Sequence, residues 1–290
     1  MGSQDRVSAA TVAGYRDRLD RVAAHIHDHL DEDIDLERLA GIACLSPWHW
    51  HRVYAAMQGE TIAQTVRRLR LQRAAHQLAN TDLPVEAVAG KAGYGSASAF
   101  GRAFRDAYGM PPARYREQGS HAGFKAAEQA EDAGGFPVEI IRVPALRCAR
   151  VRHVGSYMEI DRAFGTLFGE LGRQGLIGPA TRMLGRYHDD PGLVPETDLE
   201  SEALATLDAA AEPRPPVELV TTEGGVHAAL RYRGPYADMR NAYRWLYGTW
   251  LPRSGHEPAD APALEEYLNN PRDTPPTELL TVIMLPLKAG

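Results

Sequence analysis

The sequence predicts two domains: an all-α double helix-turn-helix module, followed by an α+β domain of two pseudo-symmetric strand-helix-strand-strand repeats. Apolar residues recur at helical spacing through the first 118 residues, and β-rich runs alternate with two amphipathic helices after residue 136. Each half also repeats itself, and 290 residues are enough for two domains of ordinary size. We expect a helical domain over 1–116, a linker over 117–136 and an α+β domain over 137–290.

The composition is typical of a soluble globular protein, with 44% hydrophobic and 24% charged residues. No run of about 18 apolar residues is present, so we expect no membrane span. The first residues, MGSQDRVSAA, lack the basic-then-apolar pattern of a signal peptide, which favours a cytoplasmic protein. Cys44 and Cys148 lie far apart in the sequence, and we expect both thiols to be reduced.

The formal charge of −6 is distributed unevenly between the two halves. Residues 36–118 hold 11 Lys and Arg against 6 Asp and Glu, a net charge of +5. Residues 136–290 hold 16 against 21, a net charge of −5. The first half is therefore suited to a polyanion such as nucleic acid, and the second half is not.

Helix boundaries in the first half follow from capping residues. Asp35 is placed as an N-cap. Ser46 opens the next helix with Pro47 at its first helical position, and Gly59 closes it. The expected helices span 15–30, 36–43, 46–59, 61–80, 85–92 and 96–108.

The first half contains one motif twice. Each copy is a short helix, a tight turn through Cys44 or Gly93, and a second helix, which is helix-turn-helix organisation. Beyond the turn, the residues matched at an offset of 50 are Ser46/Ser96, Trp50/Phe100, Arg52/Arg102, Tyr54/Phe104 and Gly59/Gly109.

The second half also contains a repeated unit. The segment VRHVGSY (151–157) recurs 79 residues later as LRYRGPY (230–236), and the following helices match through Phe164/Tyr243 and Phe168/Tyr247. We expect the two copies to pack about a pseudo-twofold axis with a cleft between them. The expected strands span 137–143, 145–153, 226–233 and 278–287, the helices 158–174 and 237–250, and the loops 188–198 and 252–262.

The stretch SPWHWHRVY (46–54) is unusually rich in aromatic and hydrogen-bonding side chains. At 100° per residue its outward face carries an arginine and an aromatic ring, which can contact guanine and thymine methyl groups in the DNA major groove; a solvated helix face is the alternative. The core-facing stripe is Trp50, Val53, Tyr54 and Met57. The outward face is Trp48, His51, Arg52 and Ala55, with His49 on its flank.

The second copy favours DNA binding over a solvated face, because an arginine recurs at the same outward phase. Its outward residues are Ser98, Gly101, Arg102 and Arg105. The helix over 61–80 would be about 30 Å long, and successive major-groove faces lie about 34 Å apart, so one chain could fill two adjacent groove segments. Phosphate contacts could come from Arg67, Arg68, Arg70 and Arg73, although Arg73 could equally be structural.

Residues 15–116 resemble the DNA-binding module of the AraC family of transcription regulators, and particularly its Mar/Rob type, through the order Ser-x-Trp-His-x-x-Arg in SPWHWHR. The resemblance implies double-stranded DNA and RNA polymerase as partners, with activation favoured over repression. The short residues Ala97, Ser98, Ala99 and Gly101 depart from the family's longer polar side chains, so we expect the second half-site to be read loosely. The expected DNA contacts are Trp48, His49, His51, Arg52, Ser96, Ser98, Arg102 and Arg105.

The acidic half is rich in aromatic residues, many of which must form its core. Ring faces attract cations by roughly 0.5–2 kcal/mol each, and a buried carboxylate favours a positive ligand. In a strand over LEEYLNNP (264–271), Glu265 and Tyr267 share one face and Glu266 points the other way. This pattern predicts a site for a hydrophobic organic cation.

Residues 137–288 resemble the GyrI-like effector-binding domain of multidrug-sensing regulators, through the two Gly-x-Tyr segments, WLYGTWLPRSG and the Glu-x-Tyr-Leu-Asn-x-Pro order of EEYLNNP. The resemblance implies that Glu265 is the acidic ligand residue. Asn270 stands where Asp is common, a departure with no clear functional meaning. The expected ligand contacts are Tyr157, Tyr187, Tyr236, Trp245, Glu265 and Tyr267.

Competing functions have weaker support. His25, His27 and His29 spread around a helix, so we expect no metal site, and no motif for a cofactor or for nucleophilic catalysis is present in a suitable context. We therefore expect no catalytic residues and no enzyme. The alternative is a hydrolase or a drug-sequestering protein that acts through Glu265 and the aromatic cleft, with a vestigial DNA-binding half.

Overall fold

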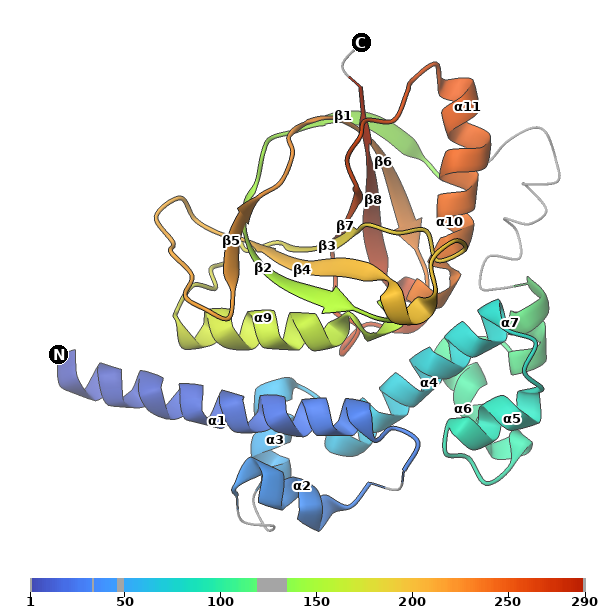
Figure 1. Ribbon diagram of the computed structural model, residues 1–290. Helices are drawn as coiled ribbons and strands as arrows, with labels where there is room; N and C mark the ends of the chain where they lie inside the picture. The colour runs from blue at the N-terminus through green and yellow to red at the C-terminus, as the bar shows by residue number, and fades with distance from the viewer. Residues whose placement is uncertain (1, 33, 46–49, 119–134, 289–290) are drawn as a thin grey trace. The chain divides into compact units, whose positions relative to one another are not determined.

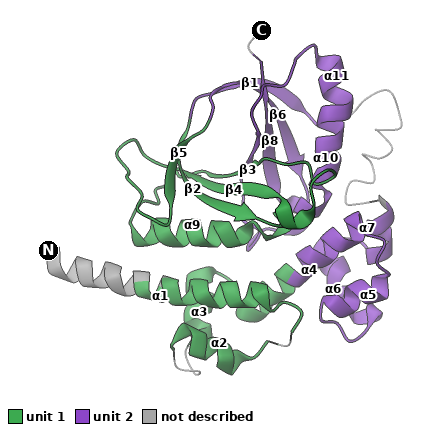
Figure 2. Cartoon of the chain, viewed as in Figure 1, with its two compact units in different colours: residues 1–69, 146–222 green, residues 70–145, 223–290 purple. Residues whose placement is uncertain are grey.

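The computed structural model describes residues 2–32, 34–45, 50–118 and 135–288 (Figure 1). Their contacts define two compact units: residues 1–69 with 146–222, and residues 70–145 with 223–290 (Figure 2). Each unit holds one helix-turn-helix motif and one copy of the strand-helix-strand-strand repeat, so the predicted fold class is confirmed. Most of the expected linker, 119–134, lies outside the described residues.

The first unit begins with three helices: α1 (Gly2–Asp28), α2 (Leu36–Ala43) and α3 (Trp50–Gln58). The α2 helix has the predicted bounds, because the Asp35 side chain accepts hydrogen bonds from the backbone N–H groups of Glu37 and Arg38. The α1 helix starts earlier than predicted. The expected start of the third helix at Ser46 lies outside the described residues.

The core of the first motif lies between α1, α2 and α3. Leu19, Val22 and Ile26 of α1 are fully buried, and Trp50 and Tyr54 of α3 are 1% and 2% exposed. Met57 was expected to continue this stripe but is 36% exposed. That expectation was wrong because α3 is only nine residues long and ends one residue after Met57, so the stripe extends no further than Tyr54.

Helix α4 (Ile62–Asn80) follows the first motif as one uninterrupted helix of 19 residues. It begins with a reciprocal cap, in which Thr61 N–H donates to Gln64 Oε1 and Gln64 N–H donates to Thr61 Oγ1. At 1.5 Å per residue its length is about 28 Å, close to the predicted value.

The second unit contains α5 (Val85–Lys91), α6 (Ala97–Tyr108) and α7 (Pro112–Gln118). Ser96 caps α6 by accepting a hydrogen bond from Ala99 N–H, and Gly109 ends it in the left-handed region with φ 73°. The α7 helix was not predicted. The core of the second motif is aromatic, and four of its rings are fully buried: Phe100, Phe104, Tyr108 and Tyr115.

The repeat in the first unit is β2 (Arg147–Val154), the short turn η1 (Tyr157–Glu159), α9 (Asp161–Arg173), β3 (Met183–Tyr187) and β4 (Glu200–Thr206). Strand β5 (Glu218–Thr221) completes an antiparallel order β3-β4-β2-β5. Helix α9 packs on β2 and β4. The strands β3 and β4 after α9 fit the predicted strand-helix-strand-strand order, although the sequence supplied no bounds for them. Strand β5 was not predicted.

The second unit repeats this arrangement with β6 (Gly225–Arg233), η3 (Tyr236–Asp238), α10 (Met239–Trp245), β7 (Ala263–Tyr267) and β8 (Leu280–Leu287). Strand β1 (Val138–Val143) pairs with β6 and gives the antiparallel order β1-β6-β8-β7. The predicted helix over 237–250 is divided, because α10 continues as a π-helical turn (Leu246–Trp250) into α11 (Leu251–Ser254). Two further short turns are η2 (Glu196–Asp198) and η5 (Pro276–Glu278).

The outer strands explain why each unit is discontinuous in sequence. Strand β1 precedes the first repeat in the chain but pairs with β6 of the second. Strand β5 precedes the second repeat but pairs with β2 of the first. The two repeats therefore exchange their leading strands.

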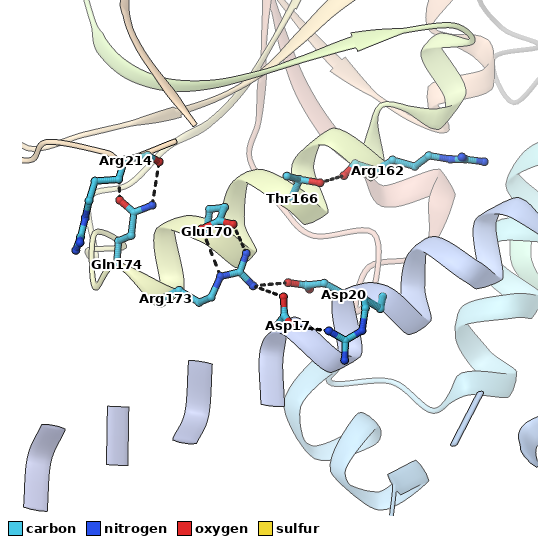
Figure 3. A network of polar contacts seen from close by, with 9 residues as sticks. Asp17, Asp20, Arg162, Thr166, Glu170, Arg173, Gln174 and Arg214 are labelled. Carbon is cyan, nitrogen blue, oxygen red and sulfur yellow. Dashed lines mark hydrogen bonds and ion pairs between the residues drawn. The ribbon is translucent and has the colours of Figure 1, made fainter. Parts of the chain in front are cut away.

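Helix α1 also packs along α9 within the first unit, so a helix of the first motif contacts a repeat helix (Figure 3). Arg173 Nη1 lies 3.5 Å from Asp17 Oδ1 and 3.5 Å from Asp20 Oδ2, and its guanidinium also bonds to Glu170. At the other end, His27 Nε2 lies 2.8 Å from Asp161 Oδ2 and Arg162 Nη1 lies 2.5 Å from Asp28 Oδ1. Close approach is possible because Gly169 faces Asp20.

Candidate functional site

The first recognition helix presents two of its predicted DNA contacts to solvent. His51 and Arg52 are exposed on α3, opposite the buried rings of Trp50 and Tyr54. The other two predicted contacts, Trp48 and His49, lie outside the described residues. The described part of α3 thus has the buried and outward faces that a recognition helix needs.

The second recognition helix, α6, exposes Ser98, Arg102 and Arg105. Arg102 Nη1 donates a hydrogen bond to Ser98 Oγ at 3.0 Å, which orients the guanidinium along the outer face of the helix. Ser96 is also exposed, but its hydroxyl is engaged as the N-cap. All four predicted contacts of this motif therefore lie on or at the start of the outward face.

The arginines of α4 differ in what they can offer to phosphate. Arg68 forms a bidentate contact with buried Glu60, with Nη2–Oε1 2.7 Å and Nε–Oε2 3.1 Å. Arg73 donates to the Lys91 carbonyl at 3.0 Å, and Arg70 fills the space beside Gly93. The side chain of Arg67 is exposed. The fold therefore assigns structural contacts to Arg68, Arg70 and Arg73, and exposes Arg67 to solvent.

The acidic half has one buried carboxylate with the features of a ligand site. Glu265, in β7, is 5% exposed. Its Oε1 accepts a hydrogen bond from the Tyr243 hydroxyl and its Oε2 accepts one from the Tyr267 hydroxyl, both at 2.8 Å. Burial raises the pKa of Glu265 to about 7, although both hydrogen bonds act to lower it. A cation would stabilise the ionised form.

Glu202 of the first repeat is a buried carboxylate whose charge is compensated by two arginines. Arg186 Nη2 lies 2.5 Å from Glu202 Oε2, and Arg150 Nη1 lies 2.9 Å from Glu202 Oε1. Among the residues that the structure describes, Glu265 bonds only to hydroxyl groups. The protein therefore supplies positive charge to the carboxylate of Glu202, whereas the described partners of Glu265 are neutral hydroxyl groups.

The structure brings four of the six predicted ligand residues into the second unit. The rings of Tyr236 and Tyr267 pack edge to face with centroids 5.6 Å apart, and Tyr267 bonds to Glu265. Trp245 packs against Phe136 with centroids 5.9 Å apart. Aromatic rings therefore lie beside the carboxylate through Tyr267 and Tyr236, whereas the ring contact of Trp245 is with Phe136.

The other two predicted ligand residues, Tyr157 and Tyr187, belong to the first unit, where their rings form a similar pair with centroids 4.8 Å apart. The Tyr157 hydroxyl donates to the carbonyl oxygens of Asp189 and Glu200, both at 3.1 Å, and accepts a hydrogen bond from Asp189 N–H. This tyrosine therefore ties the β3–β4 connection to the turn after β2.

Tyr243 is a site residue that sequence reasoning missed. The repeat alignment held the signal, because Phe164 occupies the matching position and only the second copy carries the hydroxyl. Each copy keeps a stacked pair of rings one helical turn apart, Phe164 with Phe168 and Tyr243 with Tyr247. The hydroxyl of the second copy bonds to Glu265, a contact that the phenylalanine of the first copy cannot make.

Within the described residues, no cluster of His, Cys, Asp or Glu has the arrangement of a metal site. In the same part of the chain, no helix is both long and apolar enough to cross a bilayer. The two cysteines are not joined to each other: Cys44 is exposed and Cys148 is buried.

Comparisons with known proteins agree with this arrangement. Residues 136–288 match the family model of the GyrI-like small molecule binding domain, and residues 39–118 match a helix-turn-helix domain. The chain therefore belongs to the GyrI-like family and carries a helix-turn-helix module of the AraC type. Both predicted resemblances are confirmed.

Individual relatives match the helical half. The regulatory protein SoxS of Escherichia coli (strain K12) is 30% identical over 95 residues, which are 33% of this chain and 89% of SoxS. The probable transcriptional regulator LumQ of Photobacterium leiognathi is 35% identical over 92 residues, which are 32% of this chain and 37% of LumQ. The chain thus spans only about a third of LumQ. These relatives are named as regulators, which disfavours the enzyme alternative.

One solved structure resembles most of the chain. The cryo-EM structure of an EcmrR–DNA complex has a TM-score of 0.50 at 14% sequence identity, and the match covers 88% of this chain and 99% of EcmrR. At that identity the likeness concerns the fold alone.

Proposed function

We propose that this protein is a sequence-specific DNA-binding transcription regulator that responds to a hydrophobic organic cation bound at Glu265. The observation that carries the proposal is the buried carboxylate itself, whose only described partners are the hydroxyls of Tyr243 and Tyr267. The helix-turn-helix family match and the SoxS relative support the DNA-binding part. The domain boundaries we propose are 1–116, 117–136 and 137–290.

Each motif contributes one recognition helix in this proposal. The first would read bases through Trp48, His49, His51 and Arg52, and the second through Ser96, Ser98, Arg102 and Arg105. The exposed Arg52 and Arg102 can make bidentate contacts to guanine. Because one chain carries both helices, the DNA site is asymmetric and about two helical turns long, and dimerisation is not required.

The ligand is a lipophilic cation because the site combines a carboxylate with ring faces. Tyr236 and Tyr267 supply ring surface near Glu265, with Tyr243 as an addition from the structure. Trp245, which packs against Phe136, is proposed as a further contact. Tyr157 and Tyr187 complete the proposed contact set. A protonated or quaternary amine would replace the missing counter-charge of Glu265, which a neutral ligand would not do.

The remaining parts of the proposal follow from the family. Mar/Rob-type regulators contact RNA polymerase, so we propose activation rather than repression, in the cytoplasm. The similarity to the regulatory protein SoxS supports the assignment as a regulator.

The experiment that tests the proposal is selection of bound sequences from random DNA by the full chain, with and without tetraphenylphosphonium as the probe cation. We expect one asymmetric motif of about two helical turns, whose occupancy changes with the probe. DNA binding should weaken steeply as salt rises. Recovery of no motif would refute the regulator, and a motif unaffected by every lipophilic cation tried would refute the effector role.

A further inference from the structure

One short turn in the second unit contacts both the Glu265 site and the second helix-turn-helix motif. The Tyr236 ring of η3 packs on Tyr267, which bonds to Glu265. The next residue, Ala237, is 6% exposed and belongs to the same buried cluster as Tyr115 of α7. Adjacent residues of η3 thus face the ligand carboxylate and the core beneath the second recognition helix.

The third residue of η3, Asp238, makes a buried contact with α7. Asp238 is 1% exposed and Tyr115 is fully buried. Ala237, next to Asp238, belongs to the same buried cluster as Tyr115, which places the two polar groups in one buried region. Burial raises the pKa of Tyr115 well above its usual value, and the Asp238 carboxylate raises it further. The contact falls short of a well-aligned hydrogen bond, since the Tyr115 hydroxyl has no partner of good geometry. A small movement of η3 would strengthen or break it.

Tyr232 of β6 is bonded to the residue that precedes η3. It is 1% exposed, and its hydroxyl donates to the Pro235 carbonyl at 2.7 Å, immediately before η3. After burial, the charges of Asp238 and then Glu265 raise its pKa. The buried Tyr232 is therefore influenced by both carboxylates and is bonded to the start of η3.

A second turn beside η3 reaches the recognition helix itself. The turn η5 contacts α6. The Gly234 N–H, just before η3, donates to the Leu279 carbonyl, just after η5, at 2.9 Å. The two turns are therefore linked at one end of the β6–β8 pair, and both touch the second motif.

We propose that the Asp238–Tyr115 contact couples occupancy of the Glu265 site to the presentation of α6 to DNA. The inference rests on the proposed function, and it names the contact through which ligand binding at Glu265 affects DNA binding by α6. A ligand that moves Tyr236 moves Asp238 with it, because the two residues belong to the same three-residue turn. This route does not follow the chain through 117–136.

The first repeat provides a matched control. Glu159 occupies the position of Asp238 in η1, but its side chain is 47% exposed and its ion-pair partner is Arg162 of the same repeat, at 3.4 Å. Glu159→Gln removes the same charge at the same place in the repeat without touching the second motif. Asp238→Asn and Tyr115→Phe remove one polar group each with little change of shape.

The test has one part without ligand, in which hydrogen exchange of the full chain is followed by mass spectrometry. Asp238→Asn and Tyr115→Phe should each speed exchange roughly tenfold on both sides of the contact, in α7 and in the β7 segment that holds Tyr267. Glu159→Gln should leave both segments unchanged. If exchange rises on one side only, or on neither, the coupling is refuted whatever the ligand does.

The second part measures DNA affinity of the full chain with and without saturating tetraphenylphosphonium. The ratio of the two affinities should be about 5-fold or more for the wild type and for Glu159→Gln, and should fall below about 2-fold for Asp238→Asn and Tyr115→Phe. Equal ratios in all four proteins would refute coupling through the Asp238–Tyr115 contact. Absence of probe binding to the wild type would instead refute the proposed function, and the exchange measurement would still decide the coupling.

Discussion

The Arg173 guanidinium of α9 lies 3.5 Å from the Asp20 carboxylate of α1, and Gly169, one helical turn earlier on α9, leaves the space that Asp20 occupies (Figure 3). A Cβ atom at position 169 would lie 2.3 Å from Asp20 Oδ2, closer than any van der Waals contact. The packing of the first motif on its repeat therefore depends on a glycine that neither helix pattern predicts.

Alanine is favoured over glycine inside a helix by about 1 kcal/mol. Because Gly169→Ala also displaces the Asp20 carboxylate from Arg173, it should stabilise the protein by less than this amount. In the Asp20→Ala background the obstacle is gone, so the same substitution should stabilise the protein by the full amount. Denaturant unfolding of the two single variants and the double variant measures the difference, and strictly additive effects would mean that Gly169 does not act through Asp20.

Glu265→Gln should remove a pH dependence of stability. The folded pKa of Glu265 is raised from 4.5 to about 7, so the folded state binds more protons between those values and stability falls as pH rises through this window. The expected loss is about 3 kcal/mol in the wild type, from 1.36 kcal/mol per pKa unit. Thermal unfolding from pH 4 to 8 should show the wild type losing stability relative to Glu265→Gln, with Glu266→Gln as the control.

Tyr243→Phe should raise the pKa of Glu265 above about 7, because it removes one of the two hydrogen bonds that favour the ionised carboxylate. Binding of tetraphenylphosphonium, followed by calorimetry, should then begin at a higher pH than in the wild type. Phe164→Tyr, at the matching position of the first repeat, should leave the pH profile unchanged. An identical profile for Tyr243→Phe would exclude Tyr243 from the site.

Replacing Arg68 should mainly affect the stability of the fold, whereas replacing its neighbour Arg67 should mainly affect the salt dependence of DNA binding. Arg68→Ala leaves the carboxylate of Glu60, whose side chain is 5% exposed, without its bidentate partner and should destabilise the fold by about 3–5 kcal/mol. Arg67→Ala should leave stability within about 1 kcal/mol but reduce the salt dependence of DNA binding by about one unit of slope. The two variants are compared by unfolding and by DNA titration at several salt concentrations.

The two recognition helices should differ in how strictly they read the base sequence of their half-sites. Arg52→Ala should lose about 1–3 kcal/mol at particular bases of the proximal half-site. Scrambling the distal half-site should weaken binding less than scrambling the proximal one, because α6 starts with Ala97, Ser98 and Ala99. If both scrambles abolish binding equally, α6 reads bases as strictly as α3.

Local sequence signals predicted the elements whose causes are local. Asp35 caps α2 by hydrogen bonds within three residues, and this effect was predicted correctly. The buried Trp50 and Tyr54 followed from helical periodicity. Glu265 and Tyr267 on one face followed from the two-residue period of a strand.

Local sequence signals could not predict contacts between segments that lie far apart in the chain. The exchange of β1 and β5 between repeats depends on pairing between segments about 70–90 residues apart, which no local pattern specifies. The bond from Tyr243 to Glu265, the burial of Asp238 beside Tyr115 and the assignment of Arg68 to Glu60 depend in the same way on packing. By itself the sequence determined the two families, the two internal repeats and the choice of Glu265 as the candidate carboxylate. These follow from motifs, periodicity and capping, which act between residues close in sequence. Only the tertiary structure decided which polar groups are buried together, because burial is a property of the whole fold.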